Sequence, residues 1–175
     1  LHVNNSDCDE GDYDFAVQGT GACPFNTWTG TTSTDWNTAT NWSCGFIPVA
    51  NTNVIIPNTT NKPVVGASGG VCNDIAIVGG GANLTISGTN TFTVYGNFDN
   101  AQGGTFTGNS STVTFSGSAA QTIKGGQTFG NIVLNNTNGV SILLADLVLT
   151  GNLTISSGTT LSTSNIWISI GGNWI

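Results

Sequence analysis

Apolar and polar positions repeat along the last third of the chain with a fixed period. An apolar or aromatic residue follows a Gly-Asn pair at positions 130–132, 151–153 and 172–174, so the copies recur at one constant interval. The same offset aligns Leu134 with Ile155, Val140 with Leu161, Leu147 with Ile168 and Leu149 with Ile170. A period of about 20 residues that keeps its apolar positions in register predicts a solenoid, in which each repeat forms one turn of a stack.

Within each repeat the apolar residues occur in pairs two positions apart, such as Leu147/Leu149. This alternation predicts short strands that turn one face inward. Upstream, the pairs Ile75/Ile77, Leu84/Ile86 and Phe92/Val94 follow one another every eight or nine residues, which predicts three strands per turn and a roughly triangular cross-section. We therefore predict an all-β protein, a right-handed parallel β-helix with about 21 residues per regular turn.

An earlier Gly-Asn pair, Gly96-Asn97, precedes Gly130 by more than one such period. We interpret this interval as one turn with an insertion of about 13 residues, forming an outward hairpin or loop. Because Gly and Asn tolerate positive φ, we expect the Gly-Asn pair at sharp corners. Asparagines stacked at such corners can bond to one another along the stack. The predicted ladder consists of Asn97, Asn131, Asn152 and Asn173.

Composition supports an all-β class and excludes some partners. Charged residues make up only 6% of the chain, against about 25% in ordinary soluble domains. The 38% apolar content, placed periodically, argues against disorder. A net charge of −7, with no arginine and only two lysines, argues against nucleic-acid binding, because almost no positive charge is available to neutralise phosphates. No apolar run is long enough for a membrane-spanning helix.

Residues 1–27 form an acidic segment that precedes the periodic pattern. Its carboxylates alternate in the sequence Asp-Cys-Asp-Glu-Gly-Asp-Tyr-Asp, and such spacing on a loop can wrap a hard cation. The candidate calcium ligands are Asp7, Asp9, Asp12 and Asp14. The order does not match an EF-hand loop, so a solvated acidic turn without any cofactor is the other interpretation.

Residues 28–71 contain three closely spaced tryptophans, Trp28, Trp36 and Trp42. Exposed indole rings could stack on sugars and form a glycan platform. Tryptophan usually buries most of its surface, however, and the end of a solenoid needs a cover for its unpaired strand edges. We therefore favour an N-terminal cap over a platform, followed by the β-helix over residues 72–175.

The four cysteines, Cys8, Cys23, Cys44 and Cys72, all precede the predicted β-helix or stand at its first position. An even number fits two disulfides with three possible connectivities, and buried free thiols or a metal site are the alternatives. The spacings are wider than those of zinc sites. Disulfides imply an oxidising compartment and therefore an extracellular location.

The sequence contains few candidate catalytic residues, although parallel β-helices are a common scaffold for polysaccharide lyases and hydrolases. Beyond the acidic segment the carboxylates stand alone, except that stacking could bring Asp74 and Asp99 together as a dyad. The single histidine, His2, has no partner arrangement for nucleophilic catalysis. Ice binding is a third possibility, since the chain has several Thr-x-Thr pairs, but we expect these not to repeat at one turn of the solenoid.

The chain resembles the repeat-rich, adhesin-like cell-surface proteins of Bacteroidota, a group often exported by the type IX secretion system. The resemblance covers residues 28–175 and leaves residues 1–27 outside. Its motifs here are Trp28-Thr29-Gly30, Asp35-Trp36, Asn41-Trp42-Ser43-Cys44-Gly45, Val54-Ile55-Ile56-Pro57, Lys62-Pro63-Val64, Cys72-Asn73-Asp74-Ile75, Asn83-Leu84-Thr85-Ile86, Val113-Thr114-Phe115-Ser116-Gly117, Gln121-Thr122-Ile123 and Gly151-Asn152-Leu153-Thr154-Ile155.

This resemblance implies a right-handed parallel β-helix that serves as a non-catalytic stalk or adhesive surface at the bacterial cell surface. It implies a Cys44–Cys72 disulfide that joins the cap to the first turn, which leaves Cys8 to pair with Cys23. Expected partners are further repeats of a longer chain, neighbouring copies in a filament, and glycans or cell surfaces.

The C-terminal residues lack the features of a cap. Residues 160–175 contain no charge and no proline, although solenoids usually end in an atypical polar repeat. We therefore expect the β-helix to continue in a longer chain, or its end to be covered by the next subunit of a filament. In either case we expect Trp174 and Ile175 to be packed.

Overall fold

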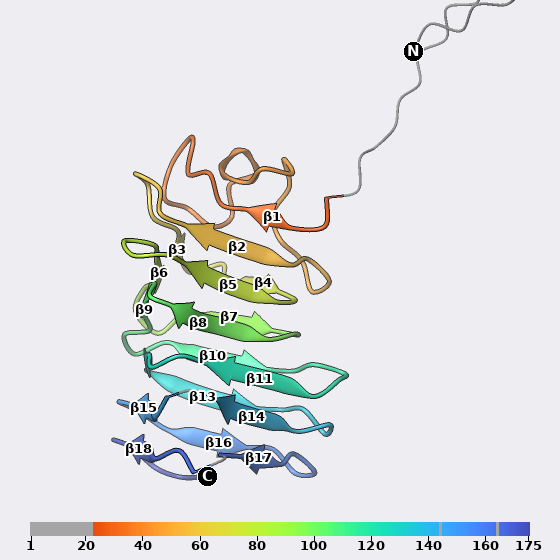
Figure 1. Ribbon diagram of the computed structural model, residues 1–175, viewed down its shortest axis with the longest axis vertical. Helices are drawn as coiled ribbons and strands as arrows, with labels where there is room; N and C mark the ends of the chain where they lie inside the picture. Colours follow the sequence, from red (N-terminus) through yellow and green to blue (C-terminus); the bar gives the residue numbers. More distant parts are fainter. Residues whose placement is uncertain (1–22, 144, 164) are drawn as a thin grey trace, which may run out of the picture.

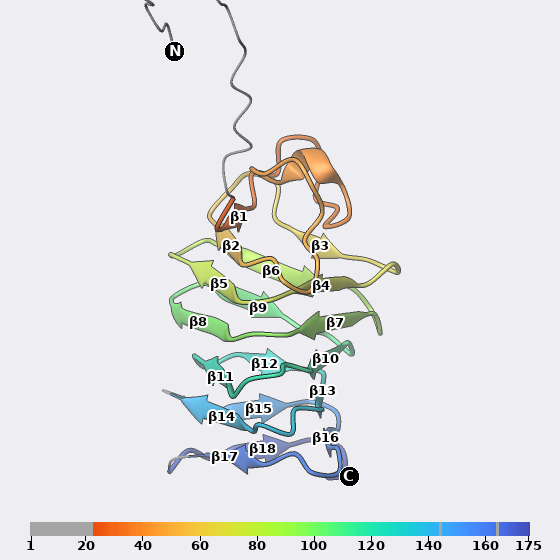
Figure 2. The ribbon, with the colours of Figure 1, turned by 90° about the vertical axis from the view of Figure 1, so that its right-hand side faces the viewer.

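The computed structural model describes residues 23–143, 145–163 and 165–175. Over this part of the chain the protein is a parallel β-solenoid, which confirms the predicted fold class (Figure 1). The described strands form three sheets of seven, six and five strands, one on each side of the stack, so the predicted three-sided turn is also confirmed (Figure 2).

All paired strands within the three sheets are parallel. The seven-stranded sheet contains β1 (Asn26–Thr27), β2 (Val54–Pro57), β5 (Ile75–Val78), β8 (Phe98–Gln102), β11 (Gln121–Lys124), β14 (Val140–Leu143) and β17 (Leu161–Ser162). The six-stranded sheet contains β3 (Val64–Val65), β6 (Asn83–Ile86), β9 (Thr105–Thr107), β12 (Thr128–Phe129), β15 (Leu147–Leu149) and β18 (Ile168–Ile170). The five-stranded sheet contains β4 (Gly70–Cys72), β7 (Thr91–Val94), β10 (Thr112–Phe115), β13 (Asn131–Leu134) and β16 (Leu153–Ile155).

The core is a column of inward-facing pairs, as the alternation predicts. Ile75, Ile77, Leu84 and Ile86 of the upper turns are at most 1% exposed. Each such side chain contributes about 1.5–3 kcal/mol by leaving water. In the middle turns the column becomes aromatic, with Phe98, Phe106 and Phe129 forming a cluster whose ring centroids are 5.0, 5.2 and 5.5 Å apart.

Turn length varies along the stack, and this overturns the predicted insertion. Phe98 pairs with Ile123, whereas Gln121 pairs with Val140, so the first of these turns is longer than the second. Gly96-Asn97 precedes β8 of the seven-stranded sheet, whereas Gly130-Asn131 leads into β13 of the five-stranded sheet. The predicted insertion is wrong, because the chain between these two pairs spans more than one full turn of ordinary strands and joins two different corners.

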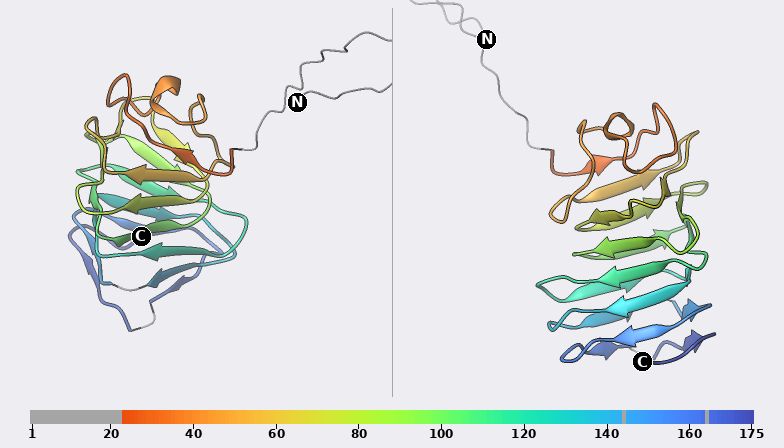
Figure 3. Two further views of the ribbon diagram at one scale, coloured as in Figure 1. Left: turned by 45° about the horizontal axis from the view of Figure 1, so that its top comes forward. Right: turned by 180° about the vertical axis from the view of Figure 1, so that it is seen from behind.

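The first turn also begins earlier than expected. Strands β2, β3 and β4 already belong to the three sheets, so the first complete turn of the solenoid starts at Val54 and not at Cys72. Above it, residues 28–48, including the short 3₁₀ helix η1 (Ala39–Asn41), fold across the end of the stack (Figure 3). Among the described residues, no helix has the length and apolar character needed to cross a membrane.

At the other end, the last residues continue the five-stranded sheet without covering it. Trp174 bridges Leu153, and the N–H of Ile155 donates to the carbonyl of Ile175 over 2.9 Å. Their side chains nevertheless remain 62% and 63% exposed. The expectation that Trp174 and Ile175 are packed concerned further turns of a longer chain or a neighbouring subunit, so it stays a prediction.

Candidate functional site

A pocket of about 430 Å³ opens on the outer face of the seven-stranded sheet. Its floor is Ala76, which stands between Ile55 on the turn above and Asp99 on the turn below. The small alanine side chain leaves a depression between two larger neighbours. Phe25, Asp74 and Lys124 also line this pocket, which therefore combines an apolar floor with a polar rim.

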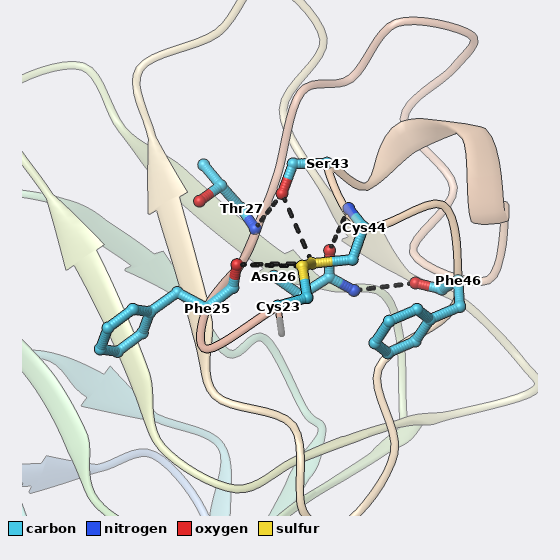
Figure 4. The surroundings of a disulfide bond; sticks show 7 residues. All are labelled: Cys23, Phe25, Asn26, Thr27, Ser43, Cys44 and Phe46. Atoms are coloured by element: carbon cyan, nitrogen blue, oxygen red, sulfur yellow. Dashed lines mark hydrogen bonds between the residues drawn. A yellow bond between two sulfur atoms is a disulfide. The ribbon is translucent and has the colours of Figure 1, made fainter. Parts of the chain in front are cut away.

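The aromatic wall of the pocket, Phe25, lies beside a disulfide between Cys23 and Cys44 (Figure 4). The Cα atoms of the two cysteines are 6.1 Å apart, and the Sγ atom of Cys44 is 3.5 Å from the carbonyl oxygen of Phe25. The buried side chain of Asn26 accepts a hydrogen bond from the N–H of Cys44 and donates one to the carbonyl of Phe46. These contacts fix the backbone at Phe25, a residue that is 52% exposed.

The carboxylates of the pocket already have partners within the chain. The Oδ1 atom of Asp74 accepts hydrogen bonds from the backbone N–H of Asn97 over 2.7 Å and from its side-chain amide over 3.1 Å. Asp99 accepts from the N–H of Ala101 over 2.9 Å and forms an ion pair with Lys124, with 3.8 Å between Oδ2 and Nζ. Stacking thus brings Asp74 and Asp99 into one pocket, as the sequence suggested. Their partners tie them to positions in the scaffold.

The asparagine ladder occupies two corners of the stack. At one corner, Oδ1 of Asn131 accepts from the N–H of Asn152, and Oδ1 of Asn152 accepts from the N–H of Asn173, over 2.8 and 2.7 Å. Asn97 belongs to the other corner, where Oδ1 of Asp74 accepts from its N–H and its own Oδ1 accepts from the N–H of Thr122. The prediction that Asn97 belongs to the same ladder as the other three asparagines is wrong, because turns of unequal length shift the corner at which a Gly-Asn pair falls.

Glycine is needed in this pair for space and not for a positive φ. None of the Gly-Asn residues at 96–97, 130–131, 151–152 and 172–173, all within the described chain, has a positive φ. A Cβ atom at Gly151 would instead lie 2.9 Å from the carbonyl oxygen of Gly130, and one at Gly172 would lie 2.8 Å from that of Gly151. The expected conformational reason is therefore wrong, and the close approach of successive turns replaces it.

The disulfide connectivity implied by the resemblance is also wrong. Cys44 pairs with Cys23 on the outside of the cap, so it cannot bridge to Cys72. Cys72 is fully buried on the inner face of β4 and forms no disulfide among the described residues. Burial raises the pKa of the Cys72 thiol well above its usual value, and the nearby Asp74 carboxylate raises it further.

The three tryptophans of the cap are buried, with exposures of 1%, 0% and 3% for Trp28, Trp36 and Trp42. Their rings meet edge to face, with centroids 4.9 Å apart for Trp28 and Trp42 and 4.7 Å apart for Trp36 and Trp42. Trp36 also contacts Phe92 on β7, at 5.1 Å between centroids. These rings cover the end of the stack and present no free face to a glycan.

Two other predicted features lie outside the described residues. These are Cys8 and the candidate calcium ligands Asp7, Asp9, Asp12 and Asp14. The calcium site stays a prediction.

Residues 27–139 fit the sequence model of a family described as a domain of unknown function, DUF8693. The chain belongs to the DUF8693 family. The matched residues include the tryptophan cap and the pocket lining from β2 to β11, while Cys23 and Phe25 precede them. Searches of curated proteins and of solved structures found no match.

The five-stranded sheet of this DUF8693 protein shows a threonine array that the sequence interpretation missed. Thr91 and Thr93 on β7 stack in register on Thr112 and Thr114 on β10. The expectation that no Thr-x-Thr pairs repeat at one turn is wrong for these two. On β13, the residues that pair with Thr112 and Thr114 are an asparagine and a valine. The regular threonine pattern is therefore only two turns deep.

The pocket residues themselves were not predicted from sequence, apart from the two aspartates. One signal was present: β2 and β5 are apolar at every position, reading Val-Ile-Ile-Pro and Ile-Ala-Ile-Val. Such strands have apolar side chains on the outer face as well as on the inner one. Here the outward residues are Ile55, Pro57, Ala76 and Val78, and all of them except Pro57 line the pocket. No local signal identified Phe25 as their neighbour.

Proposed function

We propose that this protein is a non-catalytic structural and adhesive module of the bacterial cell surface. The observation that carries the proposal is the pocket on the seven-stranded sheet, an open site with an apolar floor whose two carboxylates are held by partners in the scaffold. Such a site is suited to binding without turnover, because chemistry on a glycan needs a free acid and a free base or nucleophile.

Three further features support this role. The Cys23–Cys44 disulfide fits an oxidising, extracellular environment. The stacked parallel sheets form a stiff column that can hold a binding face away from its attachment. The resemblance to adhesin-like surface proteins of Bacteroidota agrees with both. Glycans or cell surfaces are the proposed targets, and further turns or neighbouring copies are the proposed partners of the open end.

The proposal is tested by measuring retention and turnover on the same samples. The protein is incubated with insoluble neutral and acidic polysaccharides, the bound fraction is measured by sedimentation, and new reducing or unsaturated ends are assayed in the supernatant. We expect retention on at least one surface without new ends. Absence of retention on every polysaccharide and on bacterial cells would contradict the adhesive role.

An enzyme acting on polysaccharides is the second candidate, since Asp74 and Asp99 line one pocket. Turnover in the same assay would favour it if the activity disappeared in Asp74→Asn and Asp99→Asn. The matched control is Asp35→Asn, because Asp35 lies in the cap and does not line the pocket. Under the adhesive proposal, the wild type and the three variants all give only the background level of new reducing or unsaturated ends.

A further inference from the structure

We propose that the pocket on the seven-stranded sheet binds one face of a neutral saccharide against Phe25, and that the Cys23–Cys44 disulfide sets the affinity by holding Phe25 at the rim. The inference rests on the proposed function, because it names the ligand class of that same site.

The shape and lining of the pocket suit a sugar ring. Its volume of about 430 Å³ lies within the range of small-ligand sites. Ala76, Ile55 and Val78 provide an apolar surface at the floor, and Phe25, a residue that is 52% exposed, adds an aromatic ring. An aromatic face carries partial negative charge and attracts the polarised C–H groups of a pyranose. Water-exposed phenylalanine at the mouth of a pocket is therefore explained by a ligand with an apolar face.

The rim provides hydrogen bonds for hydroxyl groups. The side chain of Gln102 lines the pocket and forms no hydrogen bond within the described part of the chain. Lys124 makes only a 3.8 Å ion pair there, so its ammonium group retains donors. Asp74 uses Oδ1 for its bonds to Asn97, which leaves Oδ2 as an acceptor. An amide, an ammonium and a carboxylate offer both donors and acceptors, as a hydroxyl-rich ligand requires.

The charges and the backbone argue against other ligands. Two carboxylates and one ammonium line the pocket, in a chain of net charge −7, which disfavours acidic sugars. An extended peptide would add itself to a free strand edge. At this pocket β5 is already paired with β2 on one side and β8 on the other, so no such edge is present. A neutral saccharide can bind through side chains alone, so it needs no free strand edge and is not repelled by the carboxylates.

The disulfide links this site to the redox state of its surroundings. Residues 23–25 approach the pocket from the cap, and Cys23 joins them covalently to Cys44 (Figure 4). Opening the bond leaves the ring of Phe25 free to leave the rim, while the floor and the rim residues on β5, β8 and β11 stay in place. The affinity for the sugar should then fall without loss of the solenoid.

Binding is measured with the purified protein and four neutral probes, cellotriose, xylotriose, mannotriose and N-acetylchitotriose, with trigalacturonate as the acidic comparison. Saturation-transfer NMR detects contact, and calorimetric titration gives Kd. We expect at least one neutral probe to bind and Phe25→Ala to weaken it about tenfold. The matched control is Phe46→Ala, because Phe46 is 42% exposed beside the same disulfide and points to its other side (Figure 4). This control should stay within about twofold.

The redox arm uses the same probe. Reductant should lower the affinity of the wild type for the sugar by about as much as Phe25→Ala does. The double variant Cys23→Ser/Cys44→Ser should already have this lower affinity, and reductant should not change it. Circular dichroism checks that all variants keep the sheet. Binding of no neutral probe, or of trigalacturonate alone, overturns the inference. Full affinity in Phe25→Ala also overturns it. If the wild type and Phe25→Ala are both retained on polysaccharide surfaces, the adhesive role stands and only the assignment to this pocket fails.

Discussion

The two ends of the solenoid use tryptophan in opposite ways. At the N-terminal end, Trp28, Trp36 and Trp42 are at most 3% exposed and pack edge to face over the first turns. At the last described turn, Trp167 and Trp174 are 80% and 62% exposed. The inner residues of this turn, such as Leu161 and Ile168, are only partly buried.

The difference lies in a loop that folds back, and not in residue type. Across the N-terminal end the fully buried side chain of Asn41 organises this loop. Its Oδ1 accepts from the N–H groups of Thr32 and Ser33, both over 2.9 Å, and its Nδ2 donates to the carbonyl of Asp35. These bonds satisfy a buried polar group and place Trp36 over the core. No described segment does this at the other end.

The largest expected effect of this difference is on stability. Trp36→Ala should lower the free energy of unfolding by about 3–5 kcal/mol, because it removes a fully buried ring and leaves a cavity. Trp167→Ala should change it by less than about 0.5 kcal/mol, because Trp167 is 80% exposed. Urea denaturation of both variants measures the contrast, and equal losses would show that the two ends are energetically alike.

The disulfide should add to the difference in stability between the two ends, because it cross-links only the capped end. It closes a segment with a sequence separation of 21, so reduction should cost about 3 kcal/mol by releasing the unfolded chain. Denaturation with and without reductant measures the loss, in a Cys8→Ser background that removes the cysteine outside the described residues. Cys23→Ser/Cys44→Ser in the same background should be less stable and indifferent to reductant.

The exclusion of water from the core at the capped end should also appear in the pH dependence of the free energy of unfolding, through the buried thiol of Cys72. The raised pKa keeps this buried thiol protonated in the folded protein, whereas the unfolded thiol ionises near pH 8.5, about its ordinary pKa. Its contribution to stability is therefore complete below that pH and declines as the pH rises toward the folded-state pKa. Between about pH 8.5 and 9.5, wild type should lose about 1 kcal/mol relative to Cys72→Ser, and at higher pH the loss should approach about 1.4 kcal/mol per pH unit.

Two measurements check this behaviour. Urea denaturation from pH 7 to 10 follows the stability difference between wild type and Cys72→Ser. Alkylation followed by peptide mapping should find Cys72 unmodified in the native protein and modified in urea. Rapid labelling of native Cys72 at pH 8 would show that water reaches the inner face of β4 and that the cap does not seal the core.

The smallest expected effect is at the asparagine ladder. Asn152→Ala should cost about 0.5–1.5 kcal/mol, because it removes the acceptor for the N–H of Asn173. Asn173 accepts from no further turn within the described chain, so Asn173→Ala should have almost no effect. Thermal unfolding of the pair of variants measures the difference, and similar losses would mean that the ladder contributes little as a hydrogen-bonded unit.

Much of the fold was predictable because it depends on local alternation. The pairs Ile75/Ile77 and Leu84/Ile86 predicted strands with one inner face, and the structure buries them as pairs. The constant offset between positions 131–151 and 152–172 predicted the stacking there, and the strands pair at that offset, as Leu147 does with Ile168. Apolar burial drives both features, and it can be read from side-chain type and spacing alone.

The candidate site was less predictable, because its residues come from five strands or loops on successive turns. Phe25, Ile55, Ala76, Asp99 and Lys124 become neighbours only through pairing across turns of different length. A repeat measured in one part of the chain does not give the register in another. The same shift moved the asparagine of the first Gly-Asn pair to a different corner from the later three.

The sequence by itself therefore determined a three-sided parallel solenoid with an apolar core and a tryptophan-covered end. Only the tertiary structure decided that Cys23 pairs with Cys44, that Cys72 stays buried as a thiol, and that Phe25 borders a pocket. The tendency to be buried is a property of each side chain, so the buried positions appear in the sequence as a periodic pattern of apolar residues. Disulfides, corners and pockets depend on the distances between turns, and those distances are set by the packing of the whole stack.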